Sequence, residues 1–76
     1  MLEIYKRVFC EAFEIEEDKA EDATSDTIDT WDSLRHMNLI VALEDEFDIE
    51  FEPEDVMELT SYHAGFALLR KHGVAL

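Results

Sequence analysis

The chain has 76 residues, of which 20 are Asp or Glu and only six are Lys or Arg, so its formal charge at neutral pH is −14. This charge argues against a protein that binds nucleic acids or anionic membranes, because polyanions repel an acidic surface. The length allows one domain, residues 1–76, with a single thin hydrophobic core and little room for an enclosed active site.

Cysteine content and apolar patterning indicate where the protein works. Cys10 is the single cysteine, so no intrachain disulfide is possible, and we expect its thiol to be a small core group. The N-terminal stretch lacks a long apolar run with a small-residue cleavage site, and no segment approaches transmembrane length. The sequence therefore predicts a cytoplasmic protein without membrane insertion.

An amphipathic helix is predicted over residues 2–15. Its apolar stripe follows the i, i+3, i+4, i+7 spacing and consists of Tyr5, Val8, Phe9 and Ala12, with Leu2 and Phe13 beside it. Residues 16–32 are polar, rich in Asp and Thr, and lack such a stripe. We expect there a long ordered loop held by Ile28 and Trp31, and a long loop in so small a domain is often functional.

A second helix is predicted over residues 33–47, with Asp32 as its N-cap. Its apolar residues cover a wide arc: Leu34, Met37, Leu39, Ile40, Val41, Leu43 and Phe47. Part of that arc is therefore expected to face a partner or to stay only partly covered. A short third helix over residues 53–58 follows, because Pro53 suits a first helical position, and Val56 and Leu59 should point inward.

A fourth helix should begin after Thr60 or Ser61, either of which can cap it. Its apolar positions, Tyr62, Phe66 and Leu69, repeat at i, i+4, i+7, and the basic group that complements its C-terminal dipole is Arg70, Lys71 and His72. Gly73 should end the helix. No segment has a strand pattern, so the predicted fold class is all-α, with three main helices and a short third one.

Ser33 stands where the second helix begins. There it lies near backbone N–H groups without partners and near the positive end of the helix dipole, which favours a negative group on its hydroxyl. An ordinary capping role would also account for this serine. His36 lies three residues on, but a nucleophile elbow and a third group to orient the imidazole are missing, so we expect no catalytic residue and no enzyme.

Acidic residues crowd residues 14–32 and 44–58 without forming a recognisable metal site. The loop lacks the alternating spacing, central glycine and terminal glutamate of a calcium-binding EF-hand, and His36, His63 and His72 show no ligand spacing. We expect no dedicated metal site. The run "EDEFDIEFEPEDVMELT" fits either a solvated face or a docking surface for a basic, apolar partner.

The stretch "DSL" followed by "NLIVALEDEFDIEF" resembles the acyl carrier proteins. The resemblance covers nearly the whole chain and is most specific from Asp32 to Phe51. Acyl carrier proteins are small acidic helical bundles whose motif serine receives a 4′-phosphopantetheine arm. The resemblance implies an acyl-carrier-like four-helix bundle in which Ser33 is the attachment site, Asp32 and Leu34 complete the motif, and a phosphopantetheinyl transferase supplies the arm from coenzyme A.

The resemblance also implies a partner surface and an acyl-sheltering core. The residues on the helix that relatives present to partner enzymes are Arg35, Met37, Val41, Glu44 and Asp45. The partners would be acyl-loading ligases or synthases with basic docking surfaces. The side chains that would bound the core are Leu43, Phe47, Phe51, Val56, Leu59 and Phe66. We expect such a carrier to be a monomer.

Three positions depart from the family pattern. Thr30 replaces a usual glycine, Trp31 is bulky beside the motif, and Arg35 is basic in a turn that is commonly acidic in fatty-acid carriers. A cation near the prosthetic phosphate points to a specialised carrier of a lipid, polyketide, aminoacyl or polysaccharide-modifying route. The alternative is a carrier-like module that binds its partner unmodified, through the acidic helix face.

Overall fold

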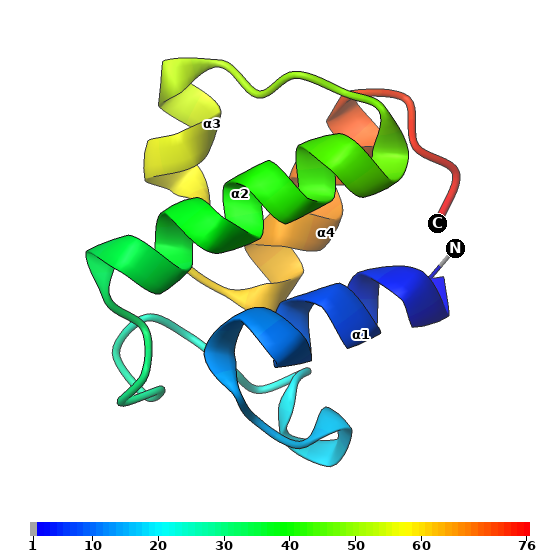
Figure 1. Cartoon of the computed structure of the whole chain (residues 1–76). Coiled ribbons are helices and arrows are strands. Elements are labelled where there is room, and N and C mark those ends of the chain that lie inside the picture. Colours follow the sequence, from blue (N-terminus) through cyan, green and yellow to red (C-terminus); the bar gives the residue numbers. More distant parts are fainter. Residues whose placement is uncertain (1) are drawn as a thin grey trace.

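Four α-helices form the fold in the computed structural model, which describes residues 2–76 (Figure 1). They are α1 (Leu2–Phe13), α2 (Ser33–Phe47), α3 (Pro53–Glu58) and α4 (Tyr62–Lys71), with a 3-10 helix, η1 (Glu17–Lys19), after α1. Within residues 2–76 no strand forms, and the predicted all-α bundle with three main helices and a short third one is confirmed. None of the described helices combines the length and hydropathy needed to cross a bilayer.

The core is aromatic on the α1 side. Tyr5, Phe9 and Phe13 have no exposed surface, because their spacing places all three on the stripe of α1 that faces the other helices. Figure 1 shows α1 lying along α2, with the two helices running in opposite directions. Burial of large rings stabilises these short helices more than intrinsic propensity does. Cys10 is buried in this core, as expected.

The first helix ends two residues earlier than predicted. Glu14 adopts a left-handed backbone conformation with φ 56°, and the N–H of Ile15 donates to the carbonyl of Cys10 at 3.1 Å. This turn directs Ile15 against the core, where it is partly buried. Ile15, inside the predicted bounds of the helix, therefore packs from outside it.

The long loop predicted over residues 16–32 begins at residue 14, and Ile28 and Trp31 pack against the core, as predicted. The short η1 helix within it was not predicted. The loop is attached to the start of α4 because the N–H of Tyr62 donates to the carbonyl of Ala23 at 3.0 Å. Ala23 is buried, so a small apolar side chain marks the point where the loop enters the core.

The predicted helix ends of α3 and α4 are largely confirmed. Ser61, and not Thr60, caps α4: its Oγ accepts from the N–H of Ala64 at 2.9 Å. Gly73 follows the end of α4 with φ 88°, a conformation that costs glycine little. At the start of α3, Glu52 and Asp55 form a reciprocal capping box.

Asp55, an acid in the first turn of α3, has no exposed surface. Its carboxylate binds Lys71 and His72, each at 2.8 Å. Lys71 and His72 therefore do more than complement the α4 dipole, since they attach α3 to the end of α4. The hydrogen bond from Lys71 holds the pKa of Asp55 well below its usual range.

Candidate functional site

Asp32 and Ser33 have different roles at the start of α2. Asp32 is the N-cap, as predicted: its backbone is extended and its Oδ1 accepts from the N–H of Arg35 at 2.8 Å. Ser33 is the first helical residue, and its side chain is exposed with no hydrogen-bond partner in residues 2–76. Because Asp32 caps the helix, the capping interpretation of Ser33 is wrong, and its hydroxyl is free for chemistry.

The start of α2 is also suited to an anion. The amide N–H groups of Ser33 and Leu34 have no acceptor among residues 2–76, and they lie at the positive end of a 15-residue helix. Asp32 satisfies the third amide, that of Arg35, and this bond lowers the pKa of the Asp32 carboxyl. Two backbone donors beside the Ser33 hydroxyl therefore remain available to a phosphate.

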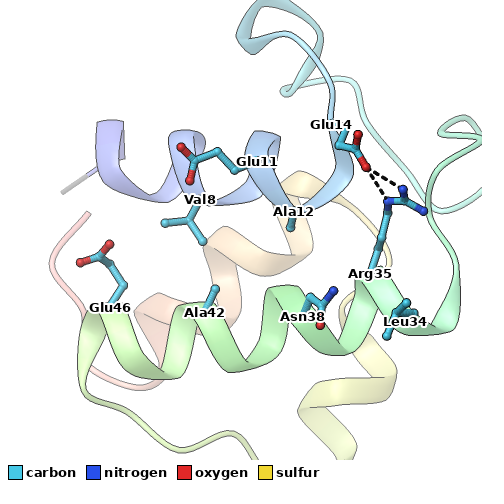
Figure 2. A pocket seen from close by; sticks show the side chains of 9 residues that line it. All are labelled: Val8, Glu11, Ala12, Glu14, Leu34, Arg35, Asn38, Ala42 and Glu46. Carbon is cyan, nitrogen blue, oxygen red and sulfur yellow. Dashed lines mark hydrogen bonds and ion pairs between the residues drawn. The ribbon is translucent and has the colours of Figure 1, made fainter.

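The cation expected near Ser33 is paired within the fold. Figure 2 shows Arg35 reaching from α2 toward Glu14 at the end of α1. Arg35 Nη2 lies 2.6 Å from Glu14 Oε2, and its Nη1 lies 3.1 Å from Asp32 Oδ2. The hydrogen bond that Arg35 donates to the Glu14 carboxylate raises the pKa of Arg35. A partner approaching Ser33 thus meets a guanidinium that two carboxylates already hold.

Trp31, His36 and α3 are joined by two hydrogen bonds. Trp31 Nε1 lies 3.0 Å from His36 Nδ1, and His36 Nε2 lies 2.8 Å from the carbonyl oxygen of Val56. An indole N–H only donates and a carbonyl only accepts, so the imidazole is neutral and carries its proton on Nε2. Both ring nitrogens are occupied, and His36 makes no bond with Ser33.

A shallow pocket of about 550 Å³ opens beside Ser33. Its lining residues are Trp31, Asp32, Ser33, His36 and Met37. The sequence pointed to these residues separately: Asp32 and Ser33 as part of the motif, Trp31 as a departure from the family pattern, and Met37 as a partner contact. Their i to i+4 spacing around the start of α2 was the signal that could have grouped them.

The expected partner residues differ in exposure. The apolar stripe on α2 is formed by Leu34, Met37 and Val41, which are 70%, 47% and 52% exposed, and Asp45 is exposed as well. Glu44 is half-buried, and its Oε2 accepts from the N–H of Phe51 at 2.9 Å. Glu44 therefore holds the loop after α2 in place and Arg35 is half-buried, whereas Met37, Val41 and Asp45 lie open at the surface.

A second groove, of about 560 Å³, lies between α1 and α2 (Figure 2). Val8, Ala12 and Ala42 contribute its apolar lining, and Glu11 is one of its acidic lining residues. Ion pairs join the two helices near both ends of this groove, because Arg7 lies 3.3 Å from Glu46 while Arg35 binds Glu14. The Arg35–Glu14 pair holds the end of α1 against the start of α2, and the Arg7–Glu46 pair holds α1 against the end of α2.

The side chains expected to bound an acyl-sheltering core divide into two groups. Leu43, Phe51 and Leu59 are buried. Phe47, Val56 and Phe66 are only partly buried and pack against the core from its edge. Within residues 2–76 no group of three or more His, Cys, Asp or Glu side chains is arranged to hold a metal ion.

Comparison with known protein families finds a match for this chain. Residues 6–64 match the family model described as "Phosphopantetheine attachment site". The matched span covers more than half of the chain and includes Ser33 at the start of α2. No curated protein matches the chain.

Proposed function

Because this chain belongs to the phosphopantetheine attachment family, we propose that it is a carrier that holds an acyl or aminoacyl intermediate on an arm attached to Ser33. Domains of this family are the site of covalent 4′-phosphopantetheine attachment. The free hydroxyl of Ser33 at the first position of α2 carries the assignment of the site. The thiol at the end of the arm, when the arm is present, holds the intermediate as a thioester.

The residues at the start of α2 fit the phosphate of such an arm. The amides of Ser33 and Leu34 are unused donors, and the helix dipole favours a negative group at this position. The carboxylate of Asp32 accepts from the third amide, that of Arg35. The Arg35 guanidinium neutralises the negative charge of this carboxylate. A negative group attached to Ser33 would therefore have two backbone N–H donors beside it. The nearby carboxylate of Asp32 would repel it little, because Arg35 neutralises that carboxylate.

Attachment needs Ser33 as the nucleophile and a transferase as the catalyst. The Ser33 Oγ would form a bond to the phosphorus of coenzyme A that carries the pantetheine, and the bond from that phosphorus to the second phosphate would break. Adenosine 3′,5′-bisphosphate leaves, and the hydroxyl proton passes to a base of the transferase. His36 does not supply that base, because the carbonyl of Val56 and the indole of Trp31 hold both its nitrogens.

The carrier itself is proposed to be non-catalytic and to rely on protein partners. Besides the phosphopantetheinyl transferase, these would be acyl-loading ligases or synthases with basic docking surfaces. The open stripe of Leu34, Met37 and Val41 supports apolar docking, and the charge of −14 would steer a basic partner toward it. The same charge disfavours nucleic acid as a ligand.

We place the carrier in a specialised pathway. Thr30 occupies the usual glycine position and donates from its Oγ1 to the carbonyl of Phe13 at 2.5 Å, while Trp31 stacks on the Phe13 ring. These contacts anchor the segment before Ser33 to the end of α1, so the unusual residues are built into this carrier's packing. A lipid, polyketide, aminoacyl or polysaccharide-modifying route fits such a carrier, working as a cytoplasmic monomer.

Intact mass spectrometry tests the proposal directly. The chain is incubated with coenzyme A and a broad-specificity transferase, and we expect the mass to rise by one phosphopantetheine group. Ser33→Ala should gain nothing, whereas Ser25→Ala, which removes another exposed serine, should be modified like the wild type. Absence of any addition to the wild-type chain would favour an unmodified interaction module instead.

A further inference from the structure

We infer that the pocket formed by Trp31, His36 and Met37 holds the pantoyl segment of the arm attached to Ser33. This inference rests on the proposed attachment at Ser33, and it assigns a resting position to the first part of the arm. Ser33 is itself one of the residues that line the pocket. A group joined to its hydroxyl therefore begins at the pocket's edge.

The polar atoms of the Trp31 and His36 side chains are already used within the fold, and the carboxylate of Asp32, which also lines the pocket, is bound to Arg35. The indole N–H of Trp31 donates to His36, and the remaining N–H of His36 donates to the carbonyl of Val56. The surfaces that these two side chains turn toward a ligand are consequently apolar. Met37, which is 47% exposed, adds a flexible thioether to the same wall.

The pocket is held in place before any ligand arrives. Trp31 stacks on Phe13 with 4.2 Å between ring centroids, and it packs edge-to-face with Phe9 with 5.7 Å between ring centroids. Both phenylalanine rings belong to the core. The position of the indole is thus set by packing on one side and by the bond to His36 on the other, so a ligand does not have to order it.

The chemistry of the arm selects the segment that fits. Directly after the phosphate comes a carbon that bears two methyl groups, and only beyond it come the amides and the thiol. The methyl groups gain most from an apolar wall, since burying an amide without a partner is costly. Covalent attachment at Ser33 raises the local concentration of this segment at the pocket, so even a weak contact would be occupied.

Trp31 is the single tryptophan of the chain, so its fluorescence reports on the pocket. After mass spectrometry confirms the added arm, we expect a lower acrylamide quenching constant and emission at shorter wavelength than in the unmodified chain. Ser33→Asp, which brings a negative charge but no pantoyl group, should not show this protection. If Ser33→Asp reproduces it, charge alone is the cause and the inference fails.

Two methionine variants test the wall of the pocket. Met37→Ser removes apolar surface from the wall and should weaken the protection of Trp31 on modification. Met57→Ser is the matched control, because Met57 is 80% exposed on α3 and does not line the pocket. Unchanged quenching in a fully modified wild-type chain would overturn the pocket assignment and leave the carrier function standing. A chain that accepts no arm would overturn both.

Discussion

The Nζ atom of Lys71 lies 2.8 Å from Oδ1 of Asp55, and the carboxylate that it meets has no exposed surface. The other oxygen, Oδ2, lies 2.8 Å from His72 Nε2 and also accepts from the N–H of Glu52 at 3.0 Å. A buried carboxylate needs such partners, because an unpaired charge in the core is strongly unfavourable. This cluster is what attaches the short α3 helix to the end of α4.

The first prediction concerns the pH dependence of stability at Asp55. Because Lys71 lowers the Asp55 pKa below its unfolded value of about 3.8, the charged form stabilises the fold above that pH. The contribution is lost as pH falls through the lower pKa of the folded state. We therefore expect Asp55→Asn to be destabilised relative to wild type at neutral pH, with a difference that shrinks as pH drops below about 4.

Denaturant unfolding at several pH values checks this prediction. Asp45→Asn removes an exposed aspartate from α2 and serves as the control, with little expected change in the free energy of unfolding. Comparison between variants cancels the general effect of neutralising the many surface acids at low pH. A difference between Asp55→Asn and wild type that stayed constant with pH would contradict the assigned role of the ion pair.

The second prediction concerns the imidazole that joins Trp31 to α3. His36→Phe leaves the indole N–H and the Val56 carbonyl without partners, and each loss is expected to cost about 1–3 kcal/mol of stability. His36→Gln offers one acceptor and one donor, so it should retain more stability than His36→Phe. The free energy of unfolding measures both, with the exposed His63→Phe as control. Equal losses in the two His36 variants would show that the hydrogen bonds are unimportant.

The third prediction concerns Arg35 and the choice of partner. Arg35→Asp replaces the guanidinium beside Ser33 with an acid, and we expect faster loading by fatty-acid enzymes that dock through basic patches. Arg7→Asp is the matched control, since Arg7 also pairs with a glutamate, but its partner Glu46 lies near the end of α2 that is opposite to Ser33. Steady-state loading rates of the modified proteins give the measurement. If both variants gained equally, net charge rather than the position of Arg35 would govern loading.

The fourth prediction concerns the close approach of α4 to α1 at Gly65. A Cβ added there would meet the Tyr5 hydroxyl and would lie 2.8 Å from Leu59 Cδ1. The Tyr5 hydroxyl is held by its bond to the carbonyl of Tyr62 at 2.5 Å, so it cannot simply move away. Gly65→Ala should therefore cost about 1–3 kcal/mol, despite the better helix propensity of alanine.

A double-mutant cycle isolates the cause of that cost. In a Tyr5→Phe background the hydroxyl is absent, so Gly65→Ala should destabilise the protein less than it does in wild type. Thermal or denaturant unfolding of the four proteins gives the coupling. Additive effects would indicate that Leu59, and not the tyrosine hydroxyl, limits the space at Gly65.

Local sequence was sufficient to predict the four α-helices, although not the 3-10 helix η1, and the motif was identified by its resemblance to a family. The bounds of α2 and α3 follow from the Asp32 cap, from Pro53 and from the apolar spacing, because caps and helical periodicity depend on residues within a turn or two of each other. The one shifted boundary, at the end of α1, arose where Ile15 is apolar but packs from a left-handed turn. Ser33 likewise stood out from its neighbours alone.

Tertiary structure alone decided how distant side chains pair around that motif. The burial of Asp55 depends on Lys71 and His72, and the neutralisation of Arg35 depends on Glu14, 21 residues earlier. The bond from His36 to the Val56 carbonyl, which helps to shape the pocket beside Ser33, spans 20 residues. No local pattern encodes such contacts, because they form only when packing of the core brings α1, α3 and α4 against α2.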